Sequence, residues 1–573
     1  MNFFLKTKKL INLKEKILIL ILTIFILISM LLEVVSIGAI IPVISSLLEH
    51  NRFSENFDFL NNFRFFELLK NFSIFFILIG FAVIFILKNF FVYFTHVFNS
   101  FVLNNITRRL SKNLFKNFSN LTYEEFTERK IAGMININTS VVDTLKESLA
   151  NTIILFTEIT VFLGIIIFLL SIEPLSILII TSVALVICYF FYKLNKNILT
   201  KWGNLINNNK EGKLQILYQS FNLIKNIKIS KKLSYFFNNF EFFNKKQYRY
   251  IFLSSCISLL PRFLFEAVGI LLITFSIIMM TKMSINTDEI IIVISILGLA
   301  SLRVLPAVAR ITNSISLIRF YKYSLDIVYN ELVNKKIKSE EIFNDEKILS
   351  FEKLELNQVS FSRKSNKLIL KDINFKLMKG DSIGIRGISG SGKTTFVDII
   401  CGLLKPSKGK IILNDNIDVS KYQNTIPIKI GYIPQDVFLT NDSLEENIAF
   451  GIRKDNIDNE KIISVMKLCE LNKFIEDNKV RPGINLGDGG SNLSGGEKQR
   501  IGIARALYED PELLIFDEFT SSLDNHTEFE ILKNLQKIIK NKTTIFISHD
   551  SSTLVNCKKI YDFENQQITN SQN

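Results

Sequence analysis

The sequence predicts a membrane all-α domain of six transmembrane helices, followed by an α/β domain of the P-loop NTPase type. Three observations lead to this prediction. The first half of the 573-residue chain holds all the apolar stretches that are long enough to cross a bilayer. The apolar runs of the second half are strand-sized and alternate with turns and amphipathic helices. The second half also holds a glycine-rich phosphate-loop motif between a strand-like and a helix-like run.

The composition excludes an ordinary soluble protein, since 48% of the residues are hydrophobic, 21% are charged and the mean hydropathy is +0.27. The net charge is +14, from 68 Lys and Arg against 54 Asp and Glu. The five cysteines are scattered and form no C-x-x-C pair, so we expect neither a disulfide framework nor a zinc site. We also expect no cleavable signal peptide, because the first apolar run is too long for one.

The apolar stretches divide the chain into domains. We expect a transmembrane domain at 1–335, a charged linker at 336–350 and a nucleotide-binding domain at 351–573. The six predicted spans are about 17–44, 73–97, 149–171, 175–194, 257–280 and 287–308.

Lys and Arg in the connecting segments set the orientation. Segment 193–250 has twelve basic residues against two acidic ones, and segment 98–148 has seven basic residues, whereas the short loop 282–289 has one. Both long segments, the N-terminus and the nucleotide-binding domain are therefore expected in the cytoplasm, with the membrane helices continuing into it. This distribution explains the charge excess without nucleic acid. Segment 54–72 lies on the opposite side, as an interfacial amphipathic helix or as an ordinary extracytoplasmic hairpin.

The phosphate-loop motif G-x-x-x-x-G-K-T follows the strand-like run 382–386 and precedes the helical run 396–400. Its glycines let backbone N–H groups surround phosphate oxygens at a helix N-terminus. Lys393 supplies charge for the β- and γ-phosphates, and the Thr394 hydroxyl is placed for Mg²⁺. The residues expected around the phosphates are Gly387, Ile388, Ser389, Gly390, Ser391, Gly392, Lys393, Thr394 and Thr395.

A second motif, Leu513–Glu518, is a short apolar strand that ends in two carboxylates. Successive side chains of a strand point in different directions, so the two carboxylates have different tasks. We expect Asp517 to hold the Mg²⁺ and its water shell. We expect Glu518 to face the γ-phosphate and an attacking water.

A third motif, Leu493–Arg500, reads Leu-Ser-Gly-Gly-Glu-Lys-Gln-Arg and opens a helix. It resembles the signature sequence of the ATP-binding cassette family, with Glu497 where glutamine is usual. The resemblance implies ATP and Mg²⁺ as cofactors. It also implies a nucleotide-sensing and metal-binding role for Gln435, a D-loop ending at Asp524 and a switch histidine at His549. Arg363 occupies the place where the family usually stacks an aromatic ring on adenine, a stacking that a guanidinium can also make.

Six spans followed by one cassette resemble a half-transporter of the exporter type, along essentially the whole chain. In such proteins Ser494, Gly495 and Gly496 of one chain close the phosphate site of another. Lys393, Glu518, Ser494 and His549 are all intact here. The resemblance therefore implies a homodimer in the inner (plasma) membrane. It also implies coupling helices near 121–131 and 228–240, which would transmit cassette closure to the membrane helices.

Ionisable residues inside spans are costly and indicate function. Arg303 and Arg310 lie on one face of the sixth span and suit a phosphate or pyrophosphate headgroup, and Arg262 is a further candidate for binding substrate. An equally weighted alternative is that Arg303 and Arg310 pair with Glu33 and Glu158 on other helices. Arg262 and Glu266 are also spaced to bridge each other, and Lys88 lies at the end of the second span.

Several runs resemble bacterial flippases for lipid-linked oligosaccharides: Ile40–Pro42, Pro261–Arg262 with Glu266, Arg303–Pro306 with Arg310, and Gly487–Gly496. The resemblance implies transport of a polyprenyl-pyrophosphate-linked glycan or a related amphipathic lipid. A drug, lipid A or peptide exporter is the alternative within transport. A membrane ATPase that regulates a partner, or an ATP-gated channel, is the alternative from another class.

Overall fold

The computed structural model describes residues 3–39, 74–170, 174–282, 287–334, 348–363, 368–388, 390–421, 426–471, 485–491, 493–520, 525–539, 542–549, 551–555, 557–564 and 566–570. Segment 54–72 and most of the expected linker lie outside these residues. The chain forms two compact units. The helical unit comprises Met1–Asn120 and Arg129–Lys336, and the cassette unit comprises Leu121–Glu128 and Ile337–Asn573.

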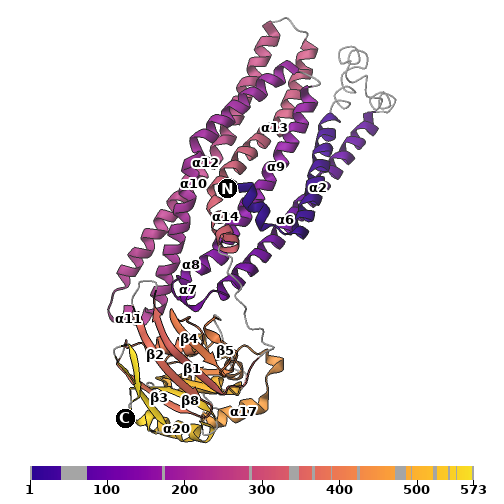
Figure 1. The fold of residues 1–573 in the computed structure, drawn as a ribbon. Coiled ribbons are helices and arrows are strands. Elements are labelled where there is room, and N and C mark those ends of the chain that lie inside the picture. Colours follow the sequence, from indigo (N-terminus) through magenta and orange to yellow (C-terminus); the bar gives the residue numbers. More distant parts are fainter. Residues whose placement is uncertain are drawn as a thin grey trace. The chain divides into compact units, whose positions relative to one another are not determined.

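The helical unit consists mainly of long helices that lie alongside one another (Figure 1). Of these, α10 and α12 pack along each other, as do α9 and α13. The described helices are α1 (Phe3–Leu10), α2 (Leu13–Gly38), α6 (Ile74–Ser119), α8 (Ile131–Asn136), η1 (Ile137–Val141), α9 (Val142–Leu170), α10 (Pro174–Asn222), α11 (Ile224–Ile229), α12 (Leu233–Lys282), α13 (Thr287–Phe320), α14 (Lys322–Tyr329) and η2 (Asn330–Asn334).

The described parts of the six predicted spans lie on α2, α6, α9, α10, α12 and α13. Among the described residues, four helical stretches are long and apolar enough to cross a membrane. They are Leu13–Gly38, Leu78–Ser119, Ile131–Phe168 and Leu233–Leu271. Parts of α10 and α13 carry side chains that the structure does not describe.

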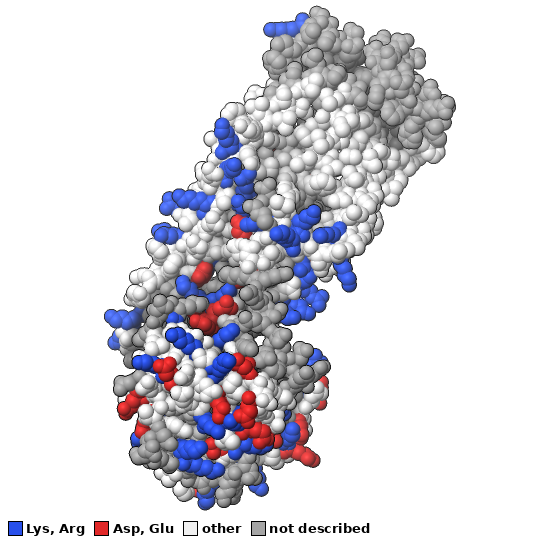
Figure 2. All heavy atoms as spheres, viewed as in Figure 1, with Lys and Arg blue, Asp and Glu red and all other residues white. Residues whose placement is uncertain are grey.

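Three helices are much longer than a membrane crossing requires, since α6, α10 and α12 have 46, 49 and 50 residues. At about 1.5 Å per residue each is roughly 70 Å long, more than twice the ~30 Å hydrocarbon core. The helices therefore continue outside the bilayer, as the two long basic segments predicted. Figure 2 shows the same division, with Lys and Arg gathered over one end of the helical unit and few charges on the rest of its described surface.

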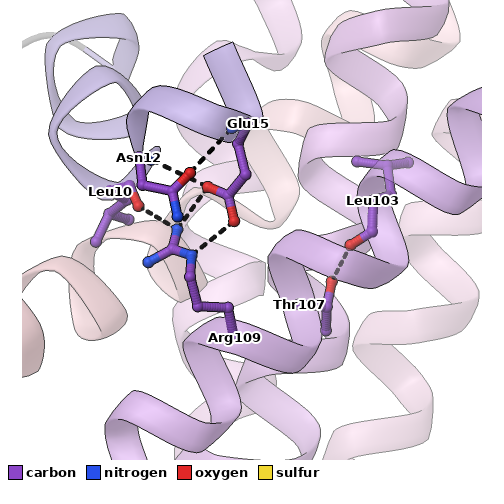
Figure 3. A network of polar contacts seen from close by, with 6 residues as sticks. All are labelled: Leu10, Asn12, Glu15, Leu103, Thr107 and Arg109. Atoms are coloured by element: carbon purple, nitrogen blue, oxygen red, sulfur yellow. Dashed lines mark hydrogen bonds and ion pairs between the residues drawn. The ribbon is translucent and has the colours of Figure 1, made fainter. Parts of the chain in front are cut away.

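A polar network fixes the junction between α1 and α2 to α6 (Figure 3). Asn12 and Glu15 form a capping box at the start of α2. Arg109 of α6 holds the Glu15 carboxylate with two hydrogen bonds, Nε to Oε1 at 2.6 Å and Nη2 to Oε2 at 2.7 Å. The same Nη2 donates to the Leu10 carbonyl at 2.6 Å. One side chain of the C-terminal third of α6 thus joins this helix to the end of α1 and the start of α2.

The cassette unit is built on two sheets. A six-stranded sheet has the order β10-β9-β3-β8-β7-β6, in which β3 runs parallel to β8 and β9, and β7 runs parallel to β6 and β8. A four-stranded antiparallel sheet has the order β2-β1-β4-β5. The strands are β1 (Lys353–Ser362), β2 (Leu368–Met378), β3 (Ser382–Gly387), β4 (Lys408–Leu413), β5 (Ile417–Asp418), β6 (Ile430–Ile433), β7 (Leu513–Asp517), β8 (Thr543–Ile547), β9 (Lys559–Glu564) and β10 (Gln567–Asn570).

The two central parallel strands, β7 and β8, are buried on both faces. Every residue of β7 and β8 is buried, as the continuous apolar runs predicted. The carboxyl ends of β3, β7 and β8 meet at one edge of the sheet, where α/β proteins bind their ligands. The helices of this unit are α7 (Tyr123–Thr127), α15 (Lys393–Ile400), α16 (Leu444–Ile448), α17 (Asn459–Leu468), α19 (Gly495–Tyr508), α20 (Asn525–Ile539) and α21 (Ser551–Leu554), with short 3₁₀ turns η4 (Val419–Lys421), η5 (Lys454–Asn456) and η6 (Asp488–Gly490).

Candidate nucleotide site

The phosphate loop connects β3 to α15, as the motif predicts. Gly390 and Gly392 have positive φ angles of 81° and 114°, which glycine adopts without strain. At Gly387 an added Cβ would lie 2.6 Å from the Phe563 carbonyl oxygen, so the backbone has no room for a side chain. The three glycines therefore permit the tight turn that leads into the N-terminus of α15. Ser389 lies outside the described residues.

Lys393 lies within this turn and is only 7% exposed. Its Nζ donates to the carbonyls of Gly387 at 2.5 Å and Ile388 at 3.2 Å, inside the loop. Burial lowers the pKa of Lys393, and the nearby carboxylates of Glu518 and Asp517 oppose that shift. The ammonium group is thus held at the place where a phosphate chain would lie.

Gln435, Glu518 and His549 follow β6, β7 and β8, and their side chains meet at this edge of the sheet. Gln435 Nε2 donates to Glu518 Oε2 at 3.0 Å, and His549 Nε2 lies 3.0 Å from Glu518 Oε1. His549 Nε2 is also 3.3 Å from Lys393 Nζ. Glu518 has a φ of 48°, an unusual conformation for a residue with a side chain, of the kind that concentrates at functional sites. Four of the predicted residues are thus brought together around one carboxylate.

Asp517 has a partner that the sequence reasoning missed. The Tyr432 hydroxyl donates to Asp517 Oδ2 at 3.0 Å. Burial raises the pKa of Asp517, and this hydrogen bond opposes the shift. Burial and the charge of Asp517 in turn raise the pKa of Tyr432. Tyr432 lies on β6, only three residues before Gln435. This closeness to a predicted site residue is the sequence feature that could have indicated a role for Tyr432.

The donor set fits Mg²⁺ and phosphate. The Thr394 hydroxyl, the Asp517 carboxylate and the Gln435 amide oxygen are hard ligands of the kind that Mg²⁺ prefers. Within the loop, the Ser391 hydroxyl is buried and has no hydrogen-bond partner among the described residues. A phosphate oxygen would supply that partner, since buried polar groups in native proteins are rarely left unsatisfied.

The signature motif forms the start of α19. Ser494 and Glu497 make a capping box, in which Ser494 Oγ accepts from Glu497 N at 3.3 Å and Ser494 N donates to Glu497 Oε2 at 2.6 Å. Glu497, where the family usually has glutamine, thus has a structural task that a carboxylate performs well. Ser494 and Gly495 are exposed and Gly496 is half-buried, so the helix start is accessible from outside the chain.

Arg363 directly follows β1 and is exposed. Its charge lies near Asp398 of α15, whose pKa it lowers against a larger opposite effect of burial. Phe361 is 3% exposed and belongs to the core, so it does not replace the missing aromatic ring. Asp524 lies outside the described residues.

The first expected coupling helix is α7, which Thr122 caps through the Glu125 backbone N–H. Leu121–Glu128 form part of the cassette unit. Burial and the charge of Asp398 raise the pKa of Tyr123 on this helix. The second short helix is α11, at Ile224–Ile229. The predicted segment 228–240 contains the end of α11, a turn with φ of 55° at Lys231 and the start of α12 at Leu233.

Two of the three candidate substrate residues are paired in the helical unit. Arg310 makes a bidentate ion pair with Glu158 of α9, with Nε–Oε1 at 2.6 Å and Nη2–Oε2 at 3.1 Å. Arg262 bridges Glu266 one turn away at 3.0 Å, and both side chains are exposed. Arg310 and Arg262 therefore form the ion pairs with Glu158 and Glu266 that the sequence analysis gave as the alternative to substrate binding. The side chain of Arg303 lies outside the described part of the structure.

Comparison with known proteins gives one family match and several curated relatives. Residues 370–521 match the family model described as ABC transporter. The leukotoxin translocation ATP-binding protein LktB of a Pasteurella haemolytica-like species (strain 5943B) is 40% identical over 202 residues, 35% of this chain and 28% of that protein. The ATP-dependent lipid A-core flippase of Desulfotalea psychrophila is 39% identical over 210 residues, 36% of each protein. The aligned region thus covers little more than a third of these relatives at most.

A solved structure extends the similarity to both units. A bacterial Atm1-family ABC exporter with ATP bound has a TM-score of 0.77 to this chain at 19% identity, covering 96% of this chain and 94% of the other. The fold is therefore that of an ABC exporter half, a helical domain followed by a P-loop cassette. Within it, residues 370–521 form an ABC transporter ATP-binding domain.

Proposed function

We propose that this chain is one half of an ATP-driven membrane transporter and that it works as a homodimer with Mg²⁺ and ATP. The main support is the cluster of Lys393, Gln435, Glu518 and His549 at the end of the parallel strands, in a chain with an exporter fold. The exposed start of α19 supports nucleotide sites that are shared between two chains. A second chain would place its Ser494, Gly495 and Gly496 against the phosphate loop.

The chemistry of the site is phosphoryl transfer to water, for which bound Mg²⁺–ATP supplies the γ-phosphate. Lys393 offsets the negative charge of the phosphates from inside the loop. Glu518, oriented by Gln435 and His549, accepts a hydrogen bond from the attacking water and polarises it. Asp517, oriented by Tyr432, takes part in metal binding.

The proposed cargo is a polyprenyl-pyrophosphate-linked oligosaccharide, or a related amphipathic lipid, moved across the bacterial inner membrane. The short membrane-domain runs that resemble oligosaccharide-lipid flippases support this choice. The lipid A-core flippase among the relatives, which is 39% identical over 210 residues, supports a lipid as the cargo. The relatives of this chain also include the leukotoxin translocation protein LktB and a multidrug resistance ABC transporter of Lactococcus lactis. They make a peptide or a drug the second candidate for the cargo.

Reconstitution into proteoliposomes tests this function. The polyprenyl-pyrophosphate glycan should raise the ATPase rate and should itself become accessible on the other leaflet, in proportion to ATP hydrolysed. The Glu518→Gln variant should still bind ATP but hydrolyse it about 10²- to 10⁴-fold more slowly, with loss of translocation. Stimulation by peptides or drugs would favour the second candidate. Hydrolysis without movement of any cargo would refute the transport proposal.

A further inference from the structure

The segment that carries Gln435 has little backbone support of its own. It begins at Pro434, directly after β6, and residues 434–439 belong to no helix or strand. Among the described backbone hydrogen bonds outside helices and strands, none involves these residues. Gln435 is exposed, yet its Nε2 donates a hydrogen bond to Glu518 Oε2 at 3.0 Å. Another part of the cassette must therefore hold the segment, because irregular backbone without such bonds opens easily.

Helix α19 supplies this support. The buried Gln499, 2% exposed, donates from Nε2 to the Pro434 carbonyl at 3.0 Å. Arg505, further along the helix, donates from Nη1 to the Phe438 carbonyl at 3.0 Å. Within the described part of the chain, both hydrogen bonds to the backbone of residues 434–439 thus come from α19. They fix this segment at Pro434 and again at Phe438.

Between these two hydrogen bonds, α19 packs closely against the segment. A Cβ added at Gly502 would lie 2.5 Å from Val437 Cγ2, so there is no room for a methyl group. A Cβ at Gly431, on the preceding strand β6, would lie 2.8 Å from the Ala506 carbonyl oxygen. Contacts this close transmit a displacement instead of absorbing it. The helix and the segment are therefore held together as one body.

We propose that Gln499 is a positioning residue of the ATPase site, because its hydrogen bond to Pro434 keeps the adjacent Gln435 amide against Glu518. Gln499 donates to Pro434 and not to Glu518, so it acts on the carboxylate through Gln435. The same helix begins at the signature motif, whose Ser494 the proposed homodimer would place against a second chain. The start of this motif is thus linked to the carboxylate of its own chain. The inference rests on the proposed role of Glu518.

Steady-state ATP hydrolysis by the full-length protein in detergent tests this role. Gln499→Met keeps the length of the side chain and removes the donor, so kcat should fall about tenfold. The KM for Mg²⁺–ATP should change by less than about twofold, because the phosphate loop is untouched. Gly502→Ala pushes Val437 away from the same helix and should show the same fall in kcat at unchanged KM.

A double-mutant cycle separates positioning from a general loss of structure. In the Gln435→Ala background the amide is absent, so adding Gln499→Met should lower kcat by no more than about twofold further. A purely structural role would lower kcat by the same factor in both backgrounds. If thermal unfolding shows that Gln499→Met does not fold, Gly502→Ala takes its place in the cycle.

Asn534→Leu is the matched control, because Asn534 of α20 is another amide that donates a hydrogen bond within the cassette, to Glu470 Oε1 at 3.4 Å. Its kcat should equal that of the parent. A parent-like kcat in Gln499→Met would overturn the inference. A further tenfold loss on adding Gln499→Met to Gln435→Ala would also overturn it.

Glu518→Gln, measured in the same assay, tests the premise separately. Hydrolysis at the parent rate by this variant would refute the proposed site and the role of Gln499 with it. Slow hydrolysis by Glu518→Gln together with a parent-like Gln499→Met would refute the positioning role alone. Because the assay measures ATP hydrolysis, its result does not depend on which cargo is transported.

Discussion

Arg109 is a single side chain on which three segments depend. Its partner Glu15 has a side-chain exposure of only 7%, and the Leu10 carbonyl at the end of α1 relies on the same guanidinium. Arg109→Ala would leave a buried carboxylate without its ion pair, which costs about 3 kcal/mol or more. We expect a lower unfolding temperature in detergent and faster hydrogen exchange in residues 3–12.

Arg108 provides the control for this prediction, since it is the adjacent arginine and is exposed. Arg108→Ala should change the stability by no more than about 0.5 kcal/mol. Equal losses in the two variants would show that the network with Glu15 does not stabilise the junction of α1 and α2.

Asp398, on the helix that follows the phosphate loop, predicts a pH dependence. Burial raises its pKa to about 6, the charge of Asp517 adds to this shift and Arg363 opposes it. The folded protein therefore binds this proton more tightly than the unfolded chain does. This proton therefore adds to the free energy of unfolding of the cassette. The contribution is fully present below about pH 4 and is lost as the pH rises through about 6.

Asp398→Asn should remove this pH-dependent contribution. Relative to the variant, the parent should lose about 1 kcal/mol of cassette stability between pH 4 and pH 7, allowing for partial solvent screening. Scanning calorimetry of the full chain without nucleotide measures the difference. Asp455→Asn, at an exposed position, serves as the control. Parallel curves for parent and Asp398→Asn across this range would contradict the assignment.

At the scale of elements, α10 crosses the bend between α13 and α14 at Gly203. A Cβ at this position would lie 1.9 Å from the Phe320 carbonyl oxygen and 3.2 Å from the Tyr323 ring. Gly203→Ala therefore forces the helices apart, at a cost of about 1 to 3 kcal/mol. We expect a lower unfolding temperature, monitored by the fluorescence of the adjacent Trp202.

Gly80 of α6 is the matched control, since nothing lies within 4 Å of a Cβ built there. Gly80→Ala should leave stability unchanged or raise it by up to about 1 kcal/mol, because alanine favours the helix. A Gly203→Ala variant as stable as the parent would mean that the crossing of α10 with the bend is not tightly packed.

Features set by neighbouring residues could be predicted from the sequence, whereas contacts between distant residues could not. The helical domain, the parallel cassette strands and the phosphate loop could be predicted because their signals are periodicity and turns within a few residues. The ion pair of Arg310 with Glu158 joins residues 152 positions apart, and Tyr432 reaches Asp517 across 85 positions. Such contacts depend on how elements pack, so the sequence left the first as one of two alternatives and did not suggest the second.

At the scale of the whole molecule, the intact halves of the nucleotide site predict that two chains act together. Lys393 belongs to the phosphate loop and Ser494 to the exposed start of α19. Lys393→Ala disables the first half of a composite site and Ser494→Arg disables the second. In a homodimer of either variant, each of the two sites therefore carries one lesion, and ATP hydrolysis should fall to background.

A mixed dimer differs, because it combines the intact loop of the Ser494→Arg chain with the intact signature of the Lys393→Ala chain in one site. Random pairing of co-expressed chains would restore up to about a quarter of the parent ATPase rate if the two sites act independently. Two different affinity tags allow the mixed dimer to be purified and assayed alone. A mixed dimer that is obtained in good yield and remains inactive would show either that each chain completes its own site or that hydrolysis requires both sites. An active monomer on gel filtration would show that each chain completes its own site and would contradict the homodimer.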